Sequence, residues 1–431
     1  MVPRPRGWTG DLARRGHRWQ RGAGVGRAAV GSTPAGVLVE GARVFDGHRV
    51  LPPTTVLVLE GRVAALGDRL GAPAGLPGVR ADGATLLPGL VDAHVHLAPG
   101  ALRAAVRFGV TTVVDMFADP AAARSAKEEA AADPSAADLR SAGFGATTPG
   151  GHPTRLVGQG LLPPFPTVGG PDEAAAFVAA RVAEGSDHLK VVLEDGTTTG
   201  RPVPCLDAGT VRALVRAAHD RGLRVVAHTL TRAHALLALD AGVDGLAHLF
   251  LDQPPSPGFV EAAVRSGAFV VPTLTSLAAR AGHARGRDLA ADPRIGHLLD
   301  PHARDLLGTA FPAAPGARAD LSHATATAAR LHEAGVPLLA GTDAASPGTA
   351  HGASLHDELA LLVAAGLSPV AALAAATSAP AAAFGLPDRG RIAPGLRADL
   401  LLVRGEPGRE VTGTRAVERV WRAGREAFAA G

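Results

Sequence analysis

The segment Leu90-Val91-Asp92-Ala93-His94-Val95-His96 places two histidines and one aspartate among apolar and small residues. The turn Leu87-Pro88-Gly89 comes directly before it, so the pattern predicts a buried strand that ends in polar side chains. Alternate residues of a strand point to the same side, which puts His94 and His96 together. Two neighbouring imidazoles can bind a divalent transition metal, although such pairs also occur by chance on half-buried strands.

Composition places the chain among globular enzymes and excludes several other classes. Its 431 residues are 46% hydrophobic and 19% charged, which is enough apolar sequence for a large core. Residues 1–27 carry a local charge of +6, which leaves about −3 for the remainder and gives no reason to expect nucleic acid binding. No apolar run reaches membrane-spanning length, so we expect no membrane association. We expect a cytoplasmic protein that forms a homo-oligomer.

Three regions of different texture divide the chain. Residues 1–36 are rich in Arg and Gly and lack periodicity, which predicts a disordered leader. Residues 37–88 and 386–431 alternate short apolar strands with turns, and we expect them to form one small composite β-sandwich from both chain ends. Residues 89–385 alternate short apolar strands with Ala-rich helices, a pattern typical of parallel β/α architecture.

The middle region contains eight candidate strands, which predicts an α/β fold of the (β/α)8 TIM barrel type. The candidates are 91–96, 111–116, 139–146, 188–194, 224–229, 245–250, 269–275 and 337–343. Barrel enzymes carry their active sites at the carboxyl ends of the strands. The Gly/Pro-rich segment 145–171 is too long for a purely structural connection, so we expect it to form a loop over the site.

Further polar residues lie within or at the ends of these strands. Lys190 lies inside an apolar segment, His228 and His248 each end one, and Asp343 ends the eighth. A lone histidine in such a place is better explained as a hydrogen-bonded core residue. Five potential ligands and a lysine at the same end of a barrel instead predict a metal site.

The ordered set His94-x-His96, Lys190, His228, His248 and Asp343 resembles the metal centre of the amidohydrolase superfamily. The likeness extends from residue 37 to residue 425. The supporting stretches are Pro88-Gly89-Leu90-Val91-Asp92-Ala93-His94, Gly341-Thr342-Asp343 and Ala393-Pro394-Gly395-Leu396-Arg397-Ala398-Asp399-Leu400. Two further pieces, Leu189-Lys190-Val191 and Gly150-Gly151-His152, resemble the imidazolonepropionase-like and Xaa-Pro dipeptidase-like branch.

The resemblance implies a centre with two divalent metal ions. His94, His96 and Asp343 would hold one ion, His228 and His248 the second, and a CO2-derived carbamate on Lys190 would bridge them. Zinc is the expected metal, with Mn, Co and Fe as alternatives. A hydroxide shared by the two ions would attack an amide carbonyl, with Asp343 as general base and then general acid. A lysine with a snorkelling stem is the alternative for Lys190.

Two further histidines are candidates for substrate contacts. We predict that His152 contacts substrate or stabilises the oxyanion, and a solvated loop histidine is the alternative. His351 follows the eighth candidate strand and is expected to line the pocket. The sequence therefore predicts hydrolysis of an amide in a small molecule, namely a dipeptide, an N-acyl amino acid or a cyclic amide. Two alternatives remain: a mononuclear deaminase or imidazolonepropionase-like hydrolase with unmodified Lys190, and a non-catalytic binding or assembly protein of the same fold.

Overall fold

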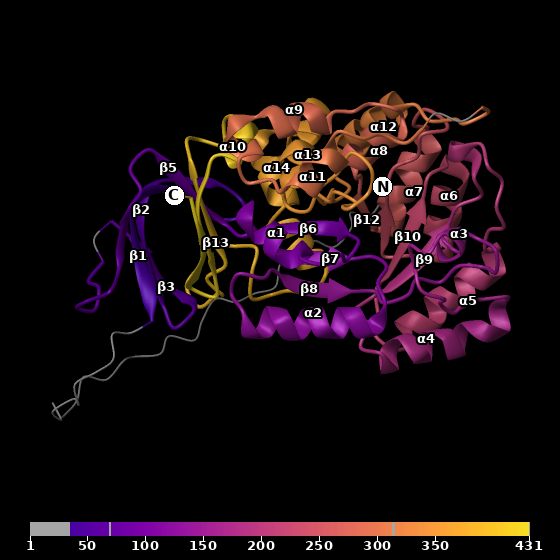
Figure 1. Cartoon of the computed structure of the whole chain (residues 1–431), viewed down its shortest axis with the longest axis horizontal. Helices are drawn as coiled ribbons and strands as arrows, with labels where there is room; N and C mark the ends of the chain where they lie inside the picture. The colour runs from indigo at the N-terminus through magenta and orange to yellow at the C-terminus, as the bar shows by residue number, and fades with distance from the viewer. Residues whose placement is uncertain (1–34, 69, 313–314, 431) are drawn as a thin grey trace, which may run out of the picture.

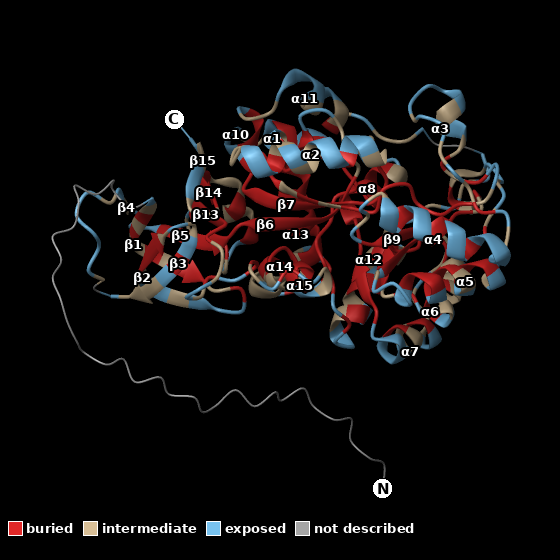
Figure 2. Ribbon diagram, turned by 90° about the horizontal axis from the view of Figure 1, so that it is seen from below, coloured by how far each residue is buried: buried red, intermediate tan, exposed pale blue. Residues whose placement is uncertain are grey.

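The computed structural model describes residues 35–430 except residue 69 and residues 313–314, so residues 1–34 of the predicted leader lie outside the described residues. Strands from both chain ends form a sheet at one end of the molecule, and helices with short parallel strands form the larger body beside it (Figure 1). Figure 2 shows buried residues running through the centre of that body, whereas helices such as α2 and α4 turn exposed residues outward.

The terminal sheet has eight strands, ordered β15-β14-β13-β5-β1-β2-β3 with β4 paired to β1. Its strands are β1 (Gly36–Phe45), β2 (Val50–Leu59), β3 (Arg62–Gly67), β4 (Gly78–Arg80), β5 (Ala84–Pro88), β13 (Leu400–Arg404), β14 (Val417–Arg422) and β15 (Arg425–Ala429). The two ends of the chain meet where β13 runs antiparallel to β5, and side chains such as Val39, Leu86 and Leu400 fill the core. Both ends thus share one sheet, and the two-layered sandwich stays a prediction.

The larger body contains two parallel sheets, ordered β6-β7-β8 and β12-β11-β10-β9. Their strands are β6 (Leu90–Val95), β7 (Val110–Asp115), β8 (Asp138–Ser141), β9 (Leu189–Leu193), β10 (Val225–Thr229), β11 (Gly245–Ala247) and β12 (Phe269–Val271). Most of these strands are buried along their whole length because helices cover them. Val91, Val114, Val226 and Val271 pack together, so strands of both sheets face one common core.

The α/β fold class is confirmed, while a closed eight-stranded barrel stays a prediction. Isolated parallel bridges join the two sheets at Ala146–Val191 and connect Leu338 to Val270 and Ala344 to Val95. The expected eighth strand, 337–343, is not a continuous strand. The amide of Leu339 donates to the Val270 carbonyl and that of Thr342 to the His94 carbonyl, as in a strand, whereas the amide of Ala340 donates to Ala375. The Asp92 carboxylate also accepts from the amide of Thr342.

Helices connect the strands and cover the outside of the body. The α-helices are α1 (Ala101–Arg107), α2 (Pro120–Ala132), α3 (Arg155–Gly158), α4 (Ala174–Ala183), α5 (Ala208–His219), α6 (Arg232–Ala241), α7 (Pro257–Ser266), α8 (Leu274–Arg280), α9 (Gly286–Ala291), α10 (Pro293–Gly296), α11 (Pro301–Leu307), α12 (Leu321–Glu333), α13 (Ala353–Ala364), α14 (Pro369–Ala375) and α15 (Ser378–Ala383). Three short 3-10 turns are η1 (Pro171–Glu173), η2 (Thr197–Thr199) and η3 (Val411–Arg415). Side-chain oxygens cap several helix starts, for example Asp207 for α5 and Ser256 for α7.

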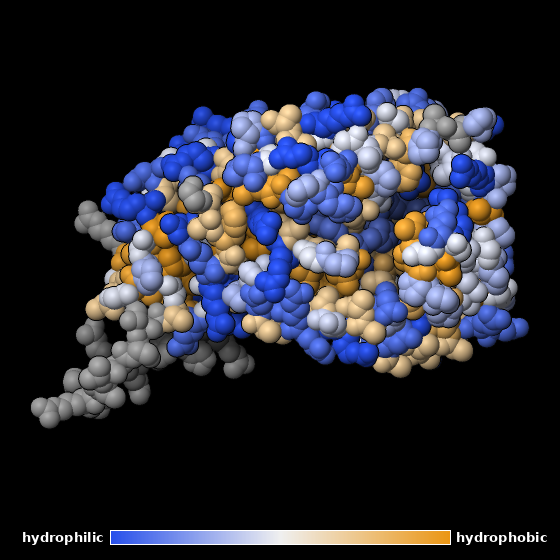
Figure 3. Space-filling view, in the orientation of Figure 1, coloured by the Kyte–Doolittle hydropathy of each residue, from blue (hydrophilic) through white to orange (hydrophobic). Residues whose placement is uncertain are grey.

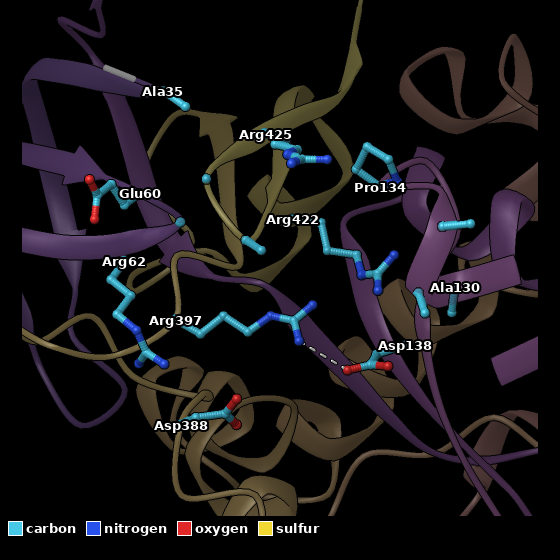
Figure 4. A pocket seen from close by; sticks show the side chains of 15 residues that line it. Ala35, Glu60, Arg62, Ala130, Pro134, Asp138, Asp388, Arg397, Arg422 and Arg425 are labelled. Carbon is cyan, nitrogen blue, oxygen red and sulfur yellow. Dashed lines mark hydrogen bonds and ion pairs between the residues drawn. The ribbon is translucent and has the colours of Figure 1, made fainter. Parts of the chain in front are cut away.

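A cavity of about 790 Å3 lies between the terminal sheet and the body, and arginines cross it (Figure 4). Arg397 reaches Asp138 across the cavity at 3.2 Å, and Arg389 pairs with the same carboxylate at 2.5 Å. The Arg422 guanidinium donates to the backbone carbonyls of Asp133 and Ala136. The contacts of Arg397 and Arg422 tie the terminal sheet region to the body near β8.

The surface is mixed in character. Figure 3 shows charged and apolar side chains interspersed on one face of the molecule. Among the described residues, the large hydrophobic side chains that stand exposed come from separate elements; they are Val50, Leu161, Val182 and Val264. In the part of the chain that the structure describes, no helix is both long and apolar enough to cross a membrane.

Candidate metal centre

The predicted metal ligands meet at the carboxyl ends of the parallel strands. His94 lies in β6 and His96 follows it, His228 lies near the end of β10, and His248 follows β11 directly. Asp343 lies in the segment that bridges to β6 and β12. Parallel strands present their carboxyl ends at the same edge, so residues far apart in sequence come together here.

His94, His96 and Asp343 form the tightest group of this site. One potential ligand atom from each residue lies within 4.8 Å of the others. Oδ1 of Asp343 is 3.0 Å from Nε2 of His96 and 3.3 Å from Nε2 of His94. His94 is fully buried, whereas the His96 side chain keeps 40% of its surface exposed. This group has the donors of a first metal site.

His228 and His248 extend the group on one side. The imidazole of His248 lies between those of His94 and His228, with ring centroids 4.7 and 4.6 Å apart. Nδ1 of His248 is 2.7 Å from the Thr273 hydroxyl, whose hydrogen goes to the Pro272 carbonyl. The hydroxyl oxygen therefore accepts from Nδ1–H, which leaves the Nε2 lone pair of His248 available to a metal.

Lys190 is buried beside these histidines. Its side chain is 2% exposed, and its Nζ has no hydrogen-bond partner among the described residues. Burial lowers the pKa of Lys190 to about 7, against the opposing effect of the Asp343 and Asp115 carboxylates. Gly145 makes room for this side chain, because a Cβ there would lie 3.2 Å from Cγ of Lys190.

The electrostatics of His94, His228, His248 and Asp343 suit metal ligands, whereas the contact with Asp343 outweighs burial and raises the pKa of His96. Burial, together with the charge of Lys190, lowers the pKa of His94 to about 3 and holds the pKa of His228 well below its ordinary value. Burial likewise lowers the pKa of His248. Contacts with His94 and His96 outweigh burial and hold the pKa of Asp343 well below its usual range. Neutral imidazoles and an ionised carboxylate are the states that bind metal.

Three residues of the site adopt the left-handed backbone region without being glycine. They are His248 with φ 71°, Thr273 with φ 51° and Asp343 with φ 58°. Such conformations are costly for ordinary residues and collect at functional sites, where the surrounding structure enforces them. The backbone therefore aims two predicted ligands and the threonine that orients one of them.

The two predicted substrate histidines lie in different cavities. His152 stacks on His228 with ring centroids 5.5 Å apart and lines a cavity of about 270 Å3. Burial lowers the pKa of His152 to about 3. His351 lines a separate cavity of about 370 Å3, next to α1 and α11. The structure thus places His152 beside His228, while His351 lines the second cavity, near enough to His96 for that histidine to contribute, after burial, to its lowered pKa.

Glu194 and Ser276 contact the ligands and are not predicted from the sequence, whereas Asp92 is a sequence candidate for orienting an imidazole. Glu194 Oε2 lies 3.4 Å from Nε2 of His228, and Ser276 donates a 2.7 Å hydrogen bond to Asp343. Glu194 is four residues after Lys190, so strand periodicity gave a usable signal for it. Asp92 is buried and accepts from Thr342 and from the amide of His94. The hydrogen bonds that Asp92 accepts among the described residues come from backbone amides and the Thr342 hydroxyl, so it holds the backbone beside the site.

Comparisons with known proteins agree with this geometry. An imidazolonepropionase of Deinococcus deserti is 29% identical over 432 residues, which cover 91% of this chain and 96% of the relative. An imidazolonepropionase of Salinispora arenicola is 30% identical and covers 85% of this chain and 90% of its own length. A crystal structure of an Xaa-Pro dipeptidase with methionine bound in the active site superposes with a TM-score of 0.74 at 22% identity, over 91% of this chain and 100% of that one.

A family model described as the amidohydrolase family matches residues 85–427, which is most of the chain. The match includes every predicted metal ligand and the strands that carry them. Together with the relatives, it shows a hydrolase that acts on carbon–nitrogen bonds. The chain belongs to the amidohydrolase family.

Proposed function

We propose that this protein is a binuclear metal-dependent hydrolase that cleaves an amide bond in a small molecule. His94, His96 and Asp343 would hold one divalent ion, zinc in our proposal. His228 and His248 would hold the second, and a carbamate formed from Lys190 and CO2 would bridge the pair. The observation that carries the proposal is the convergence of buried side chains from four different strands on one point.

The residues fit such a group. Both ring nitrogens of His94 and Nζ of Lys190 are buried and have no hydrogen-bond partner among the described residues. Burying polar groups without partners is costly, so these atoms favour an additional ligand. A buried lysine with a pKa of about 7 has a large neutral fraction, and a neutral amine can react with CO2.

When bound, the ions would polarise the scissile carbonyl and lower the pKa of water. Asp343 is placed to accept the proton of the attacking water and to pass it to the leaving amine, because its carboxylate is ionised and buried. His152 is neutral and borders the same cavity as His228, so its N–H can donate to the carbonyl oxygen as charge develops there.

We infer the finer fold from the same observations. The parallel bridges at Ala146–Val191, Val270–Leu338 and Val95–Ala344 support a ring in which both parallel sheets and the segment around Leu338 enclose one core. The proposed division is a (β/α)8 barrel over 89–385 and a composite β domain from 37–88 and 386–431. The barrel would position all six metal-binding residues at one end.

A mononuclear deaminase or imidazolonepropionase-like hydrolase is the second candidate. It is favoured by the tight three-residue group of His94, His96 and Asp343 and by the full-length similarity to proteins named imidazolonepropionase. In that case Lys190 would remain an unmodified amine. The two candidates differ in metal number and in product, because a deaminase releases ammonia from its substrate.

The test is hydrolysis of an amide library by zinc-loaded protein, by chelator-treated protein and by protein reloaded with zinc and bicarbonate. We expect release of a carboxylate and an amine, loss of at least 100-fold in rate on metal removal, and recovery on reloading. Amide hydrolysis that persists in protein shown to be metal-free would overturn the proposal. Ammonia as the only nitrogenous product would favour a deaminase, and ring opening of a cyclic substrate by protein with one ion per chain would favour an imidazolonepropionase-like hydrolase.

A further inference from the structure

Arg280 has an unusual environment at the end of α8. Its guanidinium lies over the ring of Phe311, with Cζ 4.4 Å from the ring centroid, and it lines the same cavity as His152 and His228. Phe311 is held there by a 3.0 Å hydrogen bond from its amide to the carbonyl of Ala279. Nε of Arg280 is buried and has no hydrogen-bond partner among the described residues.

Two other buried arginines of the described chain have their charge matched, whereas the buried Arg422 donates to backbone carbonyls instead. Arg181 forms a bidentate pair with Glu184, and Arg389 pairs with Asp138 and Asp388. Among the described residues, Arg280 forms no ion pair of this kind, although a partly buried charge is costly unless it is paired. The described residues therefore supply no carboxylate that pairs with Arg280, and an anionic ligand bound in this cavity would do so.

The remaining lining of the cavity is consistent with an anionic ligand. Arg155 and Arg201 lie exposed at its edge, and Glu194, whose carboxylate is already engaged by His228 and the amide of Gly196, is the acidic residue among its lining residues. The Thr198 hydroxyl is buried in the lining and also lacks a hydrogen-bond partner among the described residues. A few convergent polar groups in a small cavity are typical of a site that fixes one end of a ligand.

We propose that Arg280 binds the carboxylate of the substrate and so selects N-acyl amino acids or dipeptides over neutral and cyclic amides. This inference rests on the proposed amide hydrolysis, because it names the substrate class of that site. The planar guanidinium matches a carboxylate with two parallel hydrogen bonds, and Thr198 would supply a third donor. The scissile amide would then lie toward His228, at the metal end of the cavity.

The cavity volume limits the size of this substrate. About 270 Å3 is at the small end for ligand sites, which suits a single amino acid with a short acyl group or a dipeptide. Arg280, His152 and His228 all line this one cavity. Arg280 and the reacting end of the site therefore lie within reach of one small molecule.

The experiment compares each substrate with its own neutral twin on the same enzyme preparation. N-acetyl amino acids and Gly-Xaa dipeptides are assayed as free carboxylates and as C-terminal carboxamides. We expect wild-type protein to prefer the carboxylates, and Arg280→Gln to lose on the order of 10- to 100-fold of that preference, mainly through KM. Arg280→Lys keeps the charge and should retain part of the preference. Misfolded protein lowers the rates for the carboxylate and the carboxamide equally, so the ratio of the two rates within one preparation does not depend on it.

Arg216→Gln is the matched variant, since it removes an exposed arginine of α5 that does not line this cavity and should leave the ratio unchanged. Calorimetric binding of N-acetyl-L-leucine and N-acetyl-L-leucinamide to zinc-loaded protein provides a readout that needs no turnover. An unchanged ratio in Arg280→Gln, an equal loss of the preference in Arg216→Gln, or equal binding of the two probes by the wild-type protein would overturn the inference. Absence of turnover together with carboxylate binding that depends on Arg280 would instead count against the proposed reaction alone.

Discussion

The hydroxyl of Ser276 donates a 2.7 Å hydrogen bond to Oδ2 of Asp343. The other carboxylate oxygen, Oδ1, faces His94 and His96. The carboxylate is thereby held in one orientation, with one oxygen toward the predicted metal and one toward the protein. Ser276 is a positioning residue in this arrangement, because it touches Asp343 and none of the other predicted ligands.

Replacement of Ser276 by Ala should slow the proposed reaction without removing metal. The carboxylate of Asp343 would lose its fixed donor, and we expect kcat to fall about tenfold with KM and metal content nearly unchanged. Steady-state kinetics and metal analysis on the same sample provide the check. Ser266→Ala, at the end of α7, is the control. Loss of the metal in Ser276→Ala would show that the serine supports the site as a whole and not the position of one carboxylate.

Replacement of Gly341 by Ala should displace the chain next to His94 and so disturb the metal site. A methyl group there would lie 2.5 Å from Cγ1 of Val271 and 2.9 Å from Cβ of His94, so the chain must shift. We expect a loss of about 1–3 kcal/mol in unfolding free energy together with lower zinc content.

Gly258→Ala is the matched control for this substitution. A Cβ at Gly258 meets no described heavy atom within 4 Å, and the residue lies in α7. Alanine in a helix should therefore stabilise the protein by about 0.5–1 kcal/mol. Urea unfolding of both variants decides the point, and a Gly341→Ala protein as stable and as fully loaded as the wild type would contradict the close packing.

Acid should weaken the fold partly through His356. This buried residue is linked to Thr414 and to the carbonyl of Phe108, and burial, with Arg415, lowers the pKa of His356 to about 3. The unfolded chain takes up a proton near pH 6.5, while the folded chain does not until about pH 3. The stabilisation is therefore present in full above pH 6.5 and is lost as the pH falls toward 3.

Glutamine does not titrate, so His356→Gln should abolish the proton uptake at this position that accompanies unfolding in acid. The dependence of the unfolding free energy on pH should become shallower by up to about 1.4 kcal/mol per pH unit between pH 6 and pH 4. Denaturant unfolding of metal-free protein at several pH values measures the slope. Parallel curves for the wild type and the variant would refute the assignment of a proton to His356.

Lys190→Ala should lose the bridge between the metal ions and nearly all activity. A small carboxylate such as acetate can occupy the vacated space, so we expect partial recovery when it is added. Lys127 is the only other lysine of the chain and is bound to Asp187 near the surface, so Lys127→Ala is the natural control. Protein prepared with 13C-bicarbonate should show a carbamate resonance that disappears in Lys190→Ala alone. A signal that survives this substitution would place the modification elsewhere.

The sequence predicts the α/β class and the end of the body where the candidate ligands meet, because strand periodicity and strand ends are local properties. The segment around Leu338 and Asp343 was expected to be a strand. It departs from a regular ladder where the amide of Ala340 donates to Ala375, and Asp92, 250 residues earlier, also accepts from the amide of Thr342. Contacts between residues so distant in sequence leave no periodic signal.

The partners of the ligands were also beyond the reach of sequence patterns. Thr273 and Ser276 lie in one short segment after β12. The fold directs the hydroxyl of Ser276 to Asp343 and that of Thr273 to His248, and no sequence pattern indicates either contact. The cavity that His351 lines was also not predictable, because its position after the eighth candidate strand does not show which cavity the side chain faces. Glu194 could have been found from its spacing to Lys190.

The most direct test of the binuclear proposal is the metal content per chain of protein purified with zinc and bicarbonate. Emission spectroscopy, with protein concentration from amino-acid analysis, should give about two zinc ions per chain in the wild type, and fewer in His228→Asn and in His94→Asn. A wild-type value near one, unchanged in Lys190→Ala, would contradict the bridged centre and favour a mononuclear enzyme.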